Sequence, residues 1–150
     1  MKLVFFGTGA FGLPTLDALV KTGSNIQSIV TFAGKPSGRN LRPAPSAVKL
    51  RGLEHSLPVV EFTAANEKEV FAHISRLEPD LFVVVSFGRI LRKEFLDIPV
   101  IAPLNVHGSL LPRWRGASPM QSAILAGDVE TGVTIMRMVE KLDAGDMLVS

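Results

Sequence analysis

The sequence contains no cysteine among its 150 residues. Disulfide frameworks, thiolate zinc sites and cysteine nucleophiles are therefore excluded as explanations of this chain. It also lacks any apolar run that approaches the roughly 20 residues needed to span a bilayer, and the apolar stretch at its amino end is too short for a secretory signal. We expect a cytoplasmic protein with no membrane partner, in agreement with the lack of cysteine.

Net charge is also small, at +2, while 47% of the residues are hydrophobic. This composition argues against disorder and suits one domain with its own core. The charge is nevertheless uneven, because residues 34–52 hold cations and no acid: Lys35, Arg39, Arg42, Lys49 and Arg51. Such a stretch is either a solvated loop or an arm that contacts phosphates, since uncompensated cations attract a polyanion.

Apolar, β-branched runs alternate with helical patterns along the chain. We predict strands over residues 2–6, 25–32, 58–62, 80–86, 100–104, 131–138 and 146–149, and helices over residues 11–21, 46–53, 67–77, 91–96 and 119–126. Asn66 and Glu69 fit a capping box for the helix that ends at Leu77. The alternation predicts an α/β fold with a doubly wound, mostly parallel sheet. Ligands of such sheets bind beyond the carboxyl ends of the strands, which favours the loops after residues 86 and 104 and at 140–145.

Glycines follow the first predicted strand in the pattern G-x-G-x-x-G, at Gly7, Gly9 and Gly12. This pattern is typical of dinucleotide binding, but an acid should then close the second strand, and none occurs between Asp17 and Glu54. Because Arg39 is able to meet a 2′-phosphate, an NADP-binding Rossmann module stays open. The alternative is a tight turn that needs glycine for backbone geometry.

Residues 105–116 turn polar after an apolar strand and read as a loop. Asn105 and His107 project to the same side of an extended backbone, so an amide donor and a proton carrier face one point. The other histidines, His55 and His73, are expected at the surface, and no spacing of histidines suggests a metal site. Ser109 lacks the second glycine of a nucleophile elbow.

Asp143 and Asp146 flank a glycine in a predicted turn. From spacing alone this is an ordinary turn. If a carboxylate folds back toward His107, it favours the imidazolium form of that histidine, which suits proton transfer near neutral pH.

The segment Asn-Val-His-Gly-Ser-Leu-Leu-Pro-Arg-Trp-Arg-Gly at residues 105–116 resembles the active-site signature of folate-dependent formyltransferases. Its Arg-Trp-Arg-Gly part is most similar to the methionyl-tRNA formyltransferase family. Further similarity lies in residues 6–8, 35–39, 45–49, 86–88, 127–128, 131–136 and 142–146. The sequence departs from the family in two places. Residues 32–34 stand where the family usually has an acid and a glutamine before the basic segment, and Leu104 stands where isoleucine is common.

The resemblance implies formyl transfer from 10-formyltetrahydrofolate to the α-amino group of initiator Met-tRNA, by direct attack and without a metal. Asn105, His107 and Asp143 would form the catalytic trio, in which the first two stabilise the oxyanion of the tetrahedral intermediate and Asp143 orients His107. It also implies two binding sets. The cofactor set is Phe87, Gly88, Arg89, Ile90, Leu91, Leu142, Gly145 and Asp146. The substrate set is Ser109, Leu110, Leu111, Pro112, Arg39 and Arg42.

The resemblance further implies that residues 1–150 are a monomeric catalytic domain that is incomplete at its carboxyl end and lacks the family's carboxyl-terminal β-barrel. Two alternatives stay open. One is a formyltransferase of the same fold that acts on a small amine, such as glycinamide ribonucleotide or an amino sugar nucleotide. The other is the NADP-binding module.

Overall fold

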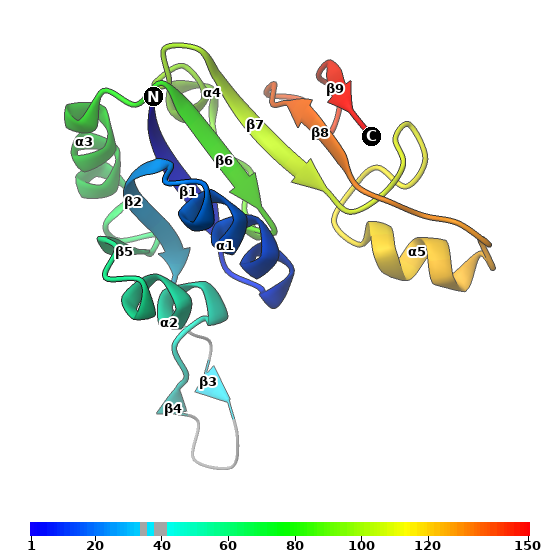
Figure 1. Ribbon diagram of the computed structural model, residues 1–150, viewed down its shortest axis with the longest axis horizontal. Helices are drawn as coiled ribbons and strands as arrows, with labels where there is room; N and C mark the ends of the chain where they lie inside the picture. The colour runs from blue at the N-terminus through cyan, green and yellow to red at the C-terminus, as the bar shows by residue number, and fades with distance from the viewer. Residues whose placement is uncertain (34–35, 38–41) are drawn as a thin grey trace.

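One seven-stranded sheet organises the chain, in a computed structural model that describes residues 1–33, 36–37 and 42–150 (Figure 1). Its strand order is β5-β2-β1-β6-β7-β8-β9. The strands are β1 (Lys2–Gly7), β2 (Asn25–Phe32), β5 (Val59–Phe62), β6 (Leu81–Val85), β7 (Ala102–His107), β8 (Thr134–Arg137) and β9 (Met147–Val149). Strands β5 to β7 in this order are parallel, whereas β8 and β9 each run antiparallel to the preceding neighbour. The predicted mostly parallel, doubly wound sheet is confirmed.

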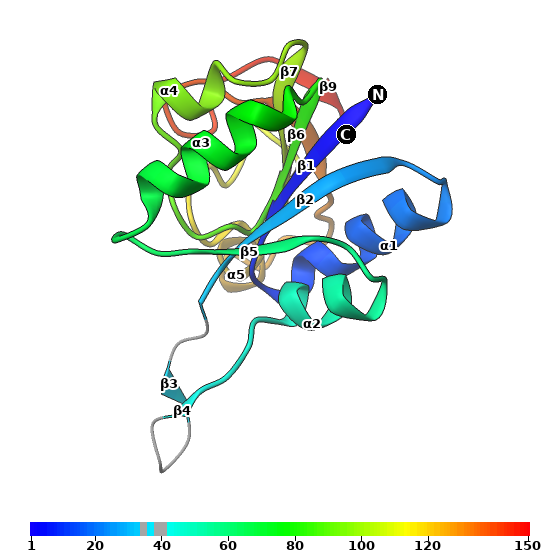
Figure 2. The ribbon, with the colours of Figure 1, turned by 90° about the vertical axis from the view of Figure 1, so that its left-hand side faces the viewer.

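Helices cover both faces of the sheet (Figure 2). They are the 3-10 turn η1 (Ala10–Gly12), α1 (Leu13–Lys21), α2 (Ala47–Glu54), α3 (Glu67–Leu77), α4 (Lys93–Leu96) and α5 (Pro119–Leu125). A small hairpin, β3 (Pro36–Ser37) with β4 (Arg42–Pro43), extends away from the body of the molecule.

Two hydrophobic clusters hold these layers together. Because side chains alternate along a strand, Phe5 packs with α1 and α2 on one face, and Phe6 packs with α3 and α4 on the other. Both rings are fully buried, which is worth about 1.5–3 kcal/mol each relative to exposure. Strand β6 contributes to both clusters, which confirms that residues 81–85 form a central strand covered on both sides.

The strand at the site begins and ends later than predicted. Instead of residues 100–104, β7 runs from Ala102 to His107, so the prediction that Asn105 and His107 belong to a loop is wrong. Asn105 pairs with Val84 of β6 and with Met136 of β8. Hydrogen bonding on both sides keeps this polar segment extended, which the local composition alone did not indicate.

Local details also differ from the prediction. Asn66 does not cap α3 with its side chain; its Oδ1 instead accepts from the backbone N–H of Thr63 at 2.7 Å, and its amide donates to the Glu61 carbonyl at 2.8 Å. Helix 91–96 begins only at Lys93, and the strand predicted at 131–138 covers only residues 134–137. The helix predicted at 11–21 opens with the 3-10 turn, and its proline lies in the first turn as expected.

Among the described residues, no helix combines the length and the apolar character required to cross a membrane.

Candidate active site

A cavity of about 440 Å³ opens at the carboxyl ends of β6 and β7. Its walls come from the strand ends, the loop after β6, the start of α5 and residues 136–143. This is the edge of the sheet where the sequence predicted a ligand. Asn105, His107 and Asp143 all line the cavity.

Two of these polar side chains converge on one carboxylate oxygen of the third. The amide Nδ2 of Asn105 donates to Oδ1 of Asp143 at 3.3 Å, and Nδ1 of His107 lies 3.6 Å from the same atom. The side chains of His107 and Asp143 are each only 5% exposed. A charged pair in such a place interacts more strongly than on the surface, because water screens it less.

His107 is held from its other side as well. Its Nε2 donates to the Trp114 carbonyl at 2.9 Å. Both ring nitrogens therefore face an acceptor oxygen: the Trp114 carbonyl lies beside Nε2, and the Asp143 carboxylate lies 3.6 Å from Nδ1.

Asp143 is fixed by the backbone around it. It has a left-handed conformation with φ of 46°, which aspartate tolerates better than most residues. Its Oδ2 accepts from the backbone N–H of Gly116 at 2.8 Å. A Cβ at Gly145 would lie 1.9 Å from the Arg137 carbonyl oxygen, so the turn that carries Asp143 lies directly against β8.

Comparison with known families gives a match to formyl transferase over residues 1–150. The chain belongs to the formyl transferase family. The methionyl-tRNA formyltransferase of Methylococcus capsulatus is 49% identical over 148 residues, which are 99% of this chain and 48% of that protein. The protein of the same name from a Geobacillus species is 47% identical and is matched over 46% of its length. This chain thus spans about half the length of the curated relatives it matches.

Solved structures of related enzymes show the same fold. Glycinamide ribonucleotide transformylase 1 from Geobacillus kaustophilus has a TM-score of 0.78 at 21% identity, over 99% of this chain and 79% of that one. A sugar N-formyltransferase from a Shewanella species has a TM-score of 0.65 at 20% identity, over 99% of this chain and 55% of that one. At these identities the likeness concerns the formyltransferase fold alone.

The residues assigned to the cofactor divide into two groups. Six line the cavity: Phe87, Gly88, Arg89, Ile90, Leu91 and Leu142. Gly145 and Asp146 do not line it; they brace the turn, since the Asp146 carbonyl accepts from the Arg137 N–H at 2.9 Å.

Among the residues assigned to the acceptor substrate, those of the loop after β7, residues 109–112, do not line the cavity. Ser109 is fully buried and donates to the Arg113 carbonyl at 2.7 Å, so its hydroxyl supports the loop. Leu111 is buried, while Leu110 and Pro112 are exposed on the same loop. Arg39 lies outside the described residues. Arg42 begins β4, and its side chain also lies outside what the structure describes.

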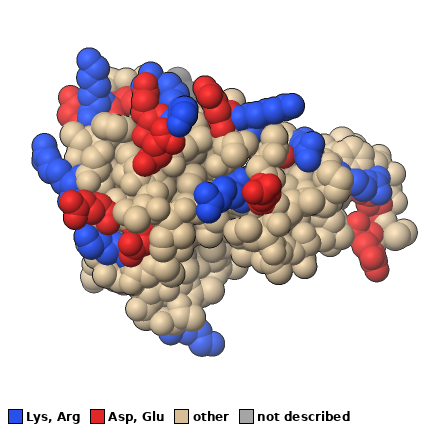
Figure 3. Space-filling model, turned by 90° about the horizontal axis from the view of Figure 1, so that it is seen from above, with Lys and Arg blue, Asp and Glu red and all other residues tan. Residues whose placement is uncertain are grey.

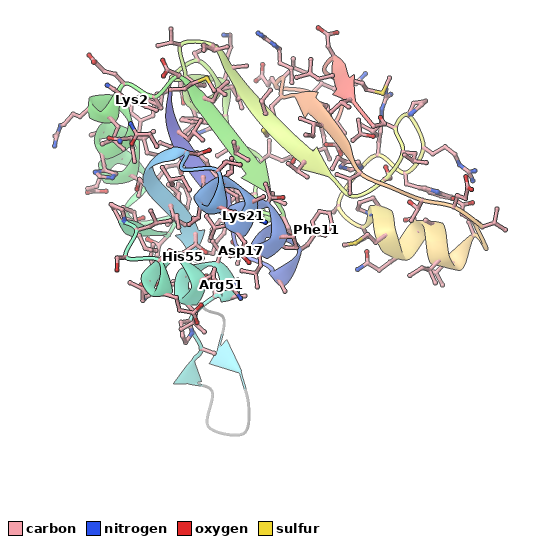
Figure 4. All side chains as sticks on the ribbon, viewed as in Figure 1. Lys2, Phe11, Asp17, Lys21, Arg51 and His55 are labelled. Carbon is pink, nitrogen blue, oxygen red and sulfur yellow. The ribbon has the colours of Figure 1, made fainter. Side chains whose placement is uncertain are left out.

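Two cations of the basic stretch have acidic partners that lie far away in the sequence. Lys49 pairs with Glu61 at 2.9 Å, and Arg51 bonds Asp17 on α1. Figure 4 shows Asp17, Arg51 and His55 close together between α1 and α2. Figure 3 likewise shows basic and acidic side chains interspersed on the face it displays. The expectation of an uncompensated cation cluster is therefore wrong for Lys49 and Arg51.

The glycine motif is explained by packing. A Cβ at Gly7 would lie 2.7 Å from the Phe5 ring and 3.1 Å from the Val85 carbonyl oxygen. The N–H of Thr8 in the same turn donates to the Ser86 carbonyl at 3.2 Å. Glycine is required here for close approach to the end of β6, which supports the tight-turn interpretation over the dinucleotide one.

The other two histidines lie away from the cavity. His55 is exposed, as expected. His73 on α3 was expected at the surface but is half-buried, and its Nε2 lies 3.3 Å from the Ser28 hydroxyl. Within the described ranges, no group of three or more histidine, aspartate and glutamate side chains is arranged to hold a metal ion.

Sequence reasoning missed several cavity residues, all of them ordinary in character: Phe11, Met120, Gln121, Met136, Met138 and Glu140. The apolar members resemble ordinary core residues and the two polar ones resemble ordinary surface residues, so no local pattern marks these positions. Figure 4 shows Phe11 beside the first turn of α1, on the side toward β7.

Proposed function

We propose that this domain transfers a formyl group from 10-formyltetrahydrofolate to the α-amino group of Met-tRNA. The observation that carries the proposal is the convergence of the Asn105 amide and the His107 ring on one oxygen of Asp143, inside the cavity. The family match over residues 1–150 supports formyl transfer. The relatives named methionyl-tRNA formyltransferase support the acceptor, although the chain spans about half their length.

The cavity suits a flat, partly polar ring system. Its volume of about 440 Å³ lies within the usual range of about 300–1,000 Å³ for small-molecule sites. Ile90 and Leu142 are large apolar side chains on its wall that remain 61% and 51% exposed. The segment 87–91 and the polar side chain of Glu140 lie on the same wall. When bound, the folate supplies an activated formyl group.

Each member of the trio then has a distinct task. The Asn105 contact with Asp143 uses one of its two amide hydrogens, and the amide donates to the formyl oxygen as negative charge develops there. Asp143 accepts a proton from the attacking amine. His107, held between the Trp114 carbonyl and Asp143, stabilises the negative charge that develops on the formyl oxygen.

The reaction balances without a covalent enzyme intermediate. The amine nitrogen bonds to the formyl carbon, the bond from that carbon to N10 of the folate breaks, and the proton removed from the amine ends on N10. No side-chain nucleophile is required, which agrees with the structural role of the Ser109 hydroxyl.

Met-tRNA is the acceptor that the relatives' names favour, and its initiator form stays a prediction. Under this proposal the reaction takes place in the cytoplasm. The assignment of Arg39 and Arg42 to the tRNA acceptor stem stays a prediction, as do the monomeric state and the incomplete carboxyl end.

Calorimetric titration of the chain with 5-formyltetrahydrofolate, a stable analogue, tests the folate site. We expect saturable binding, and about 10-fold weaker binding for Ile90→Asp because a charge replaces an apolar contact on the cavity wall. Leu125→Asp is the matched control, since Leu125 is 87% exposed and does not line the cavity. Absence of binding by the folded chain, or equal effects of both variants, would refute the folate site.

Formyl transfer assays then separate the acceptors. We expect product with Met-tRNA and none with glycinamide ribonucleotide or an amino sugar nucleotide. Product only with a small amine would keep the formyl transfer chemistry and overturn the tRNA assignment.

A further inference from the structure

Asp128 does not line the cavity, but its side chain is hydrogen-bonded to the loop segment 113–116, which reaches the cavity. Its side chain is 11% exposed. One carboxylate oxygen accepts from the indole N–H of Trp114 at 2.6 Å, and the other accepts from the Arg113 guanidinium at 2.8 Å. The backbone N–H of Asp128 donates to the Ala123 carbonyl at 3.0 Å, which ties this carboxylate to the end of α5. Charge-assisted bonds of this kind are stronger than neutral ones.

Trp114 is held in a conformation that tryptophan rarely adopts. Its φ is 58°, in the left-handed region that disfavours residues with bulky side chains. The indole bond to Asp128 and the Arg113 guanidinium, 5.2 Å from the centre of the indole ring, hold the side chain. Only because the backbone turns in this way does the Trp114 carbonyl reach Nε2 of His107 at 2.9 Å.

The same short loop also holds Asp143. Two residues after Trp114, the N–H of Gly116 donates to Asp143 at 2.8 Å. One loop segment, residues 113–116, therefore contacts His107 through a carbonyl and Asp143 through an N–H. The position of this segment depends on Asp128, which bonds it on the side away from His107 and Asp143.

We propose that Asp128 is a positioning residue for His107 and Asp143. By holding the Trp114 side chain, it places the carbonyl that accepts from the His107 ring. Asp128 acts through Trp114 and touches neither substrate. The role in catalysis rests on the proposed function, whereas the effect on His107 is a property of the chain alone.

Nuclear magnetic resonance of the His107 ring tests this role of Asp128 without any substrate. The chain has three histidines, which makes assignment of the ring signals practical. In the wild-type chain we expect a slowly exchanging Nε2 proton at His107. Asp128→Ala should speed the exchange of this proton at least 10-fold. Trp114→Phe, which keeps an aromatic side chain but removes the indole N–H, should do the same.

Arg113→Gln separates the two contacts of Asp128, because it removes the guanidinium and leaves the Trp114–Asp128 bond in place. We expect it to speed the exchange at His107 less than Asp128→Ala does. Trp114 is also the chain's single tryptophan, so a red-shifted emission in Asp128→Ala reports directly that the indole has been released. If Asp128→Ala fails to fold, Trp114→Phe still decides the question. An unchanged Nε2 exchange rate in a folded variant would overturn the proposal.

Kinetics give a second, separate readout. In Trp114→Phe we expect kcat for formyl transfer to fall about 10- to 100-fold, because small misplacements of catalytic groups have effects of this size. KM for the folate should change less than twofold, since Trp114 does not line the cavity. Failure of the proposed function would appear as inactivity of the wild-type chain with the exchange result intact. An active Trp114→Phe with wild-type kcat would overturn the positioning role alone.

Discussion

The hydroxyl of Thr134 fastens the other end of the active-site loop. Thr134 is fully buried in β8 beside His107, with which it pairs. Its Oγ1 donates to the Ser109 carbonyl at 2.8 Å and accepts from the Leu111 N–H at 3.1 Å. Replacing it by valine keeps the shape of the side chain but leaves both buried backbone groups without this partner.

The expected loss of stability follows from these two bonds. A buried polar group left unsatisfied costs about 1–3 kcal/mol, so Thr134→Val should lower the free energy of unfolding by roughly 2–6 kcal/mol. Thr134→Ser keeps the hydroxyl and loses one buried methyl group, which costs about 1 kcal/mol. Since domains are stable by only about 5–15 kcal/mol, the difference between the two variants is large enough to measure.

Urea unfolding followed by circular dichroism gives both numbers. Because Trp114 lies in the loop that Thr134 holds, its fluorescence reports the release of that loop, which should occur at a lower urea concentration in Thr134→Val than in the wild-type chain. The reasoning fails if Thr134→Val is as stable as Thr134→Ser, since the hydroxyl would then not satisfy the loop.

Three further predictions concern the site and the surface. Asn105→Ala should lower kcat for formyl transfer about 100- to 1,000-fold, and a loss below 10-fold in single-turnover assays would remove Asn105 from the trio. Gly145→Ala should lower both the melting temperature and folate affinity, because its Cβ would lie 1.9 Å from the Arg137 carbonyl oxygen; wild-type values by calorimetry would contradict this packing. The Arg51 guanidinium lowers the pKa of Asp17 below its ordinary value of 3.8, so the carboxylate stabilises the fold above about pH 4 and this stabilisation is lost as the pH falls below that. Asp17→Asn should therefore melt at a lower temperature than wild type at pH 7, and the gap should narrow as the pH is lowered below about 4; a gap that does not change with pH would refute the pair.

The sheet was predictable because its signal is local. Runs such as residues 81–85 are apolar on both faces, and a covered parallel strand is what that pattern indicates. The common direction of Asn105 and His107 also followed from the two-residue period of an extended chain. The extent of β7 did not, because hydrogen bonding to β6 and β8, rather than composition, keeps its polar end in the sheet.

Contacts between distant segments and backbone geometry escaped the sequence. The pairing of Lys49 with Glu61 depends on the placement of α2 beside β5. The left-handed turn at Trp114 and the carbonyl it presents to His107 leave no trace in residue type. Asp128 belongs to a motif that resembles the family, but nothing in its spacing indicates that it bonds Trp114.

The two hydrophobic clusters have a consequence for how activity is lost. Every buried member of both clusters precedes Asn105 in the chain. The segment that carries Trp114, Asp128 and Asp143 is fastened by hydrogen bonds, and its buried apolar residues are few: Leu111, Ala123 and Met136. Segments with few buried apolar contacts open at lower free energy than the core. We therefore expect heat or mild denaturant to release this segment first, so that the catalytic arrangement disappears while most of the sheet is still folded.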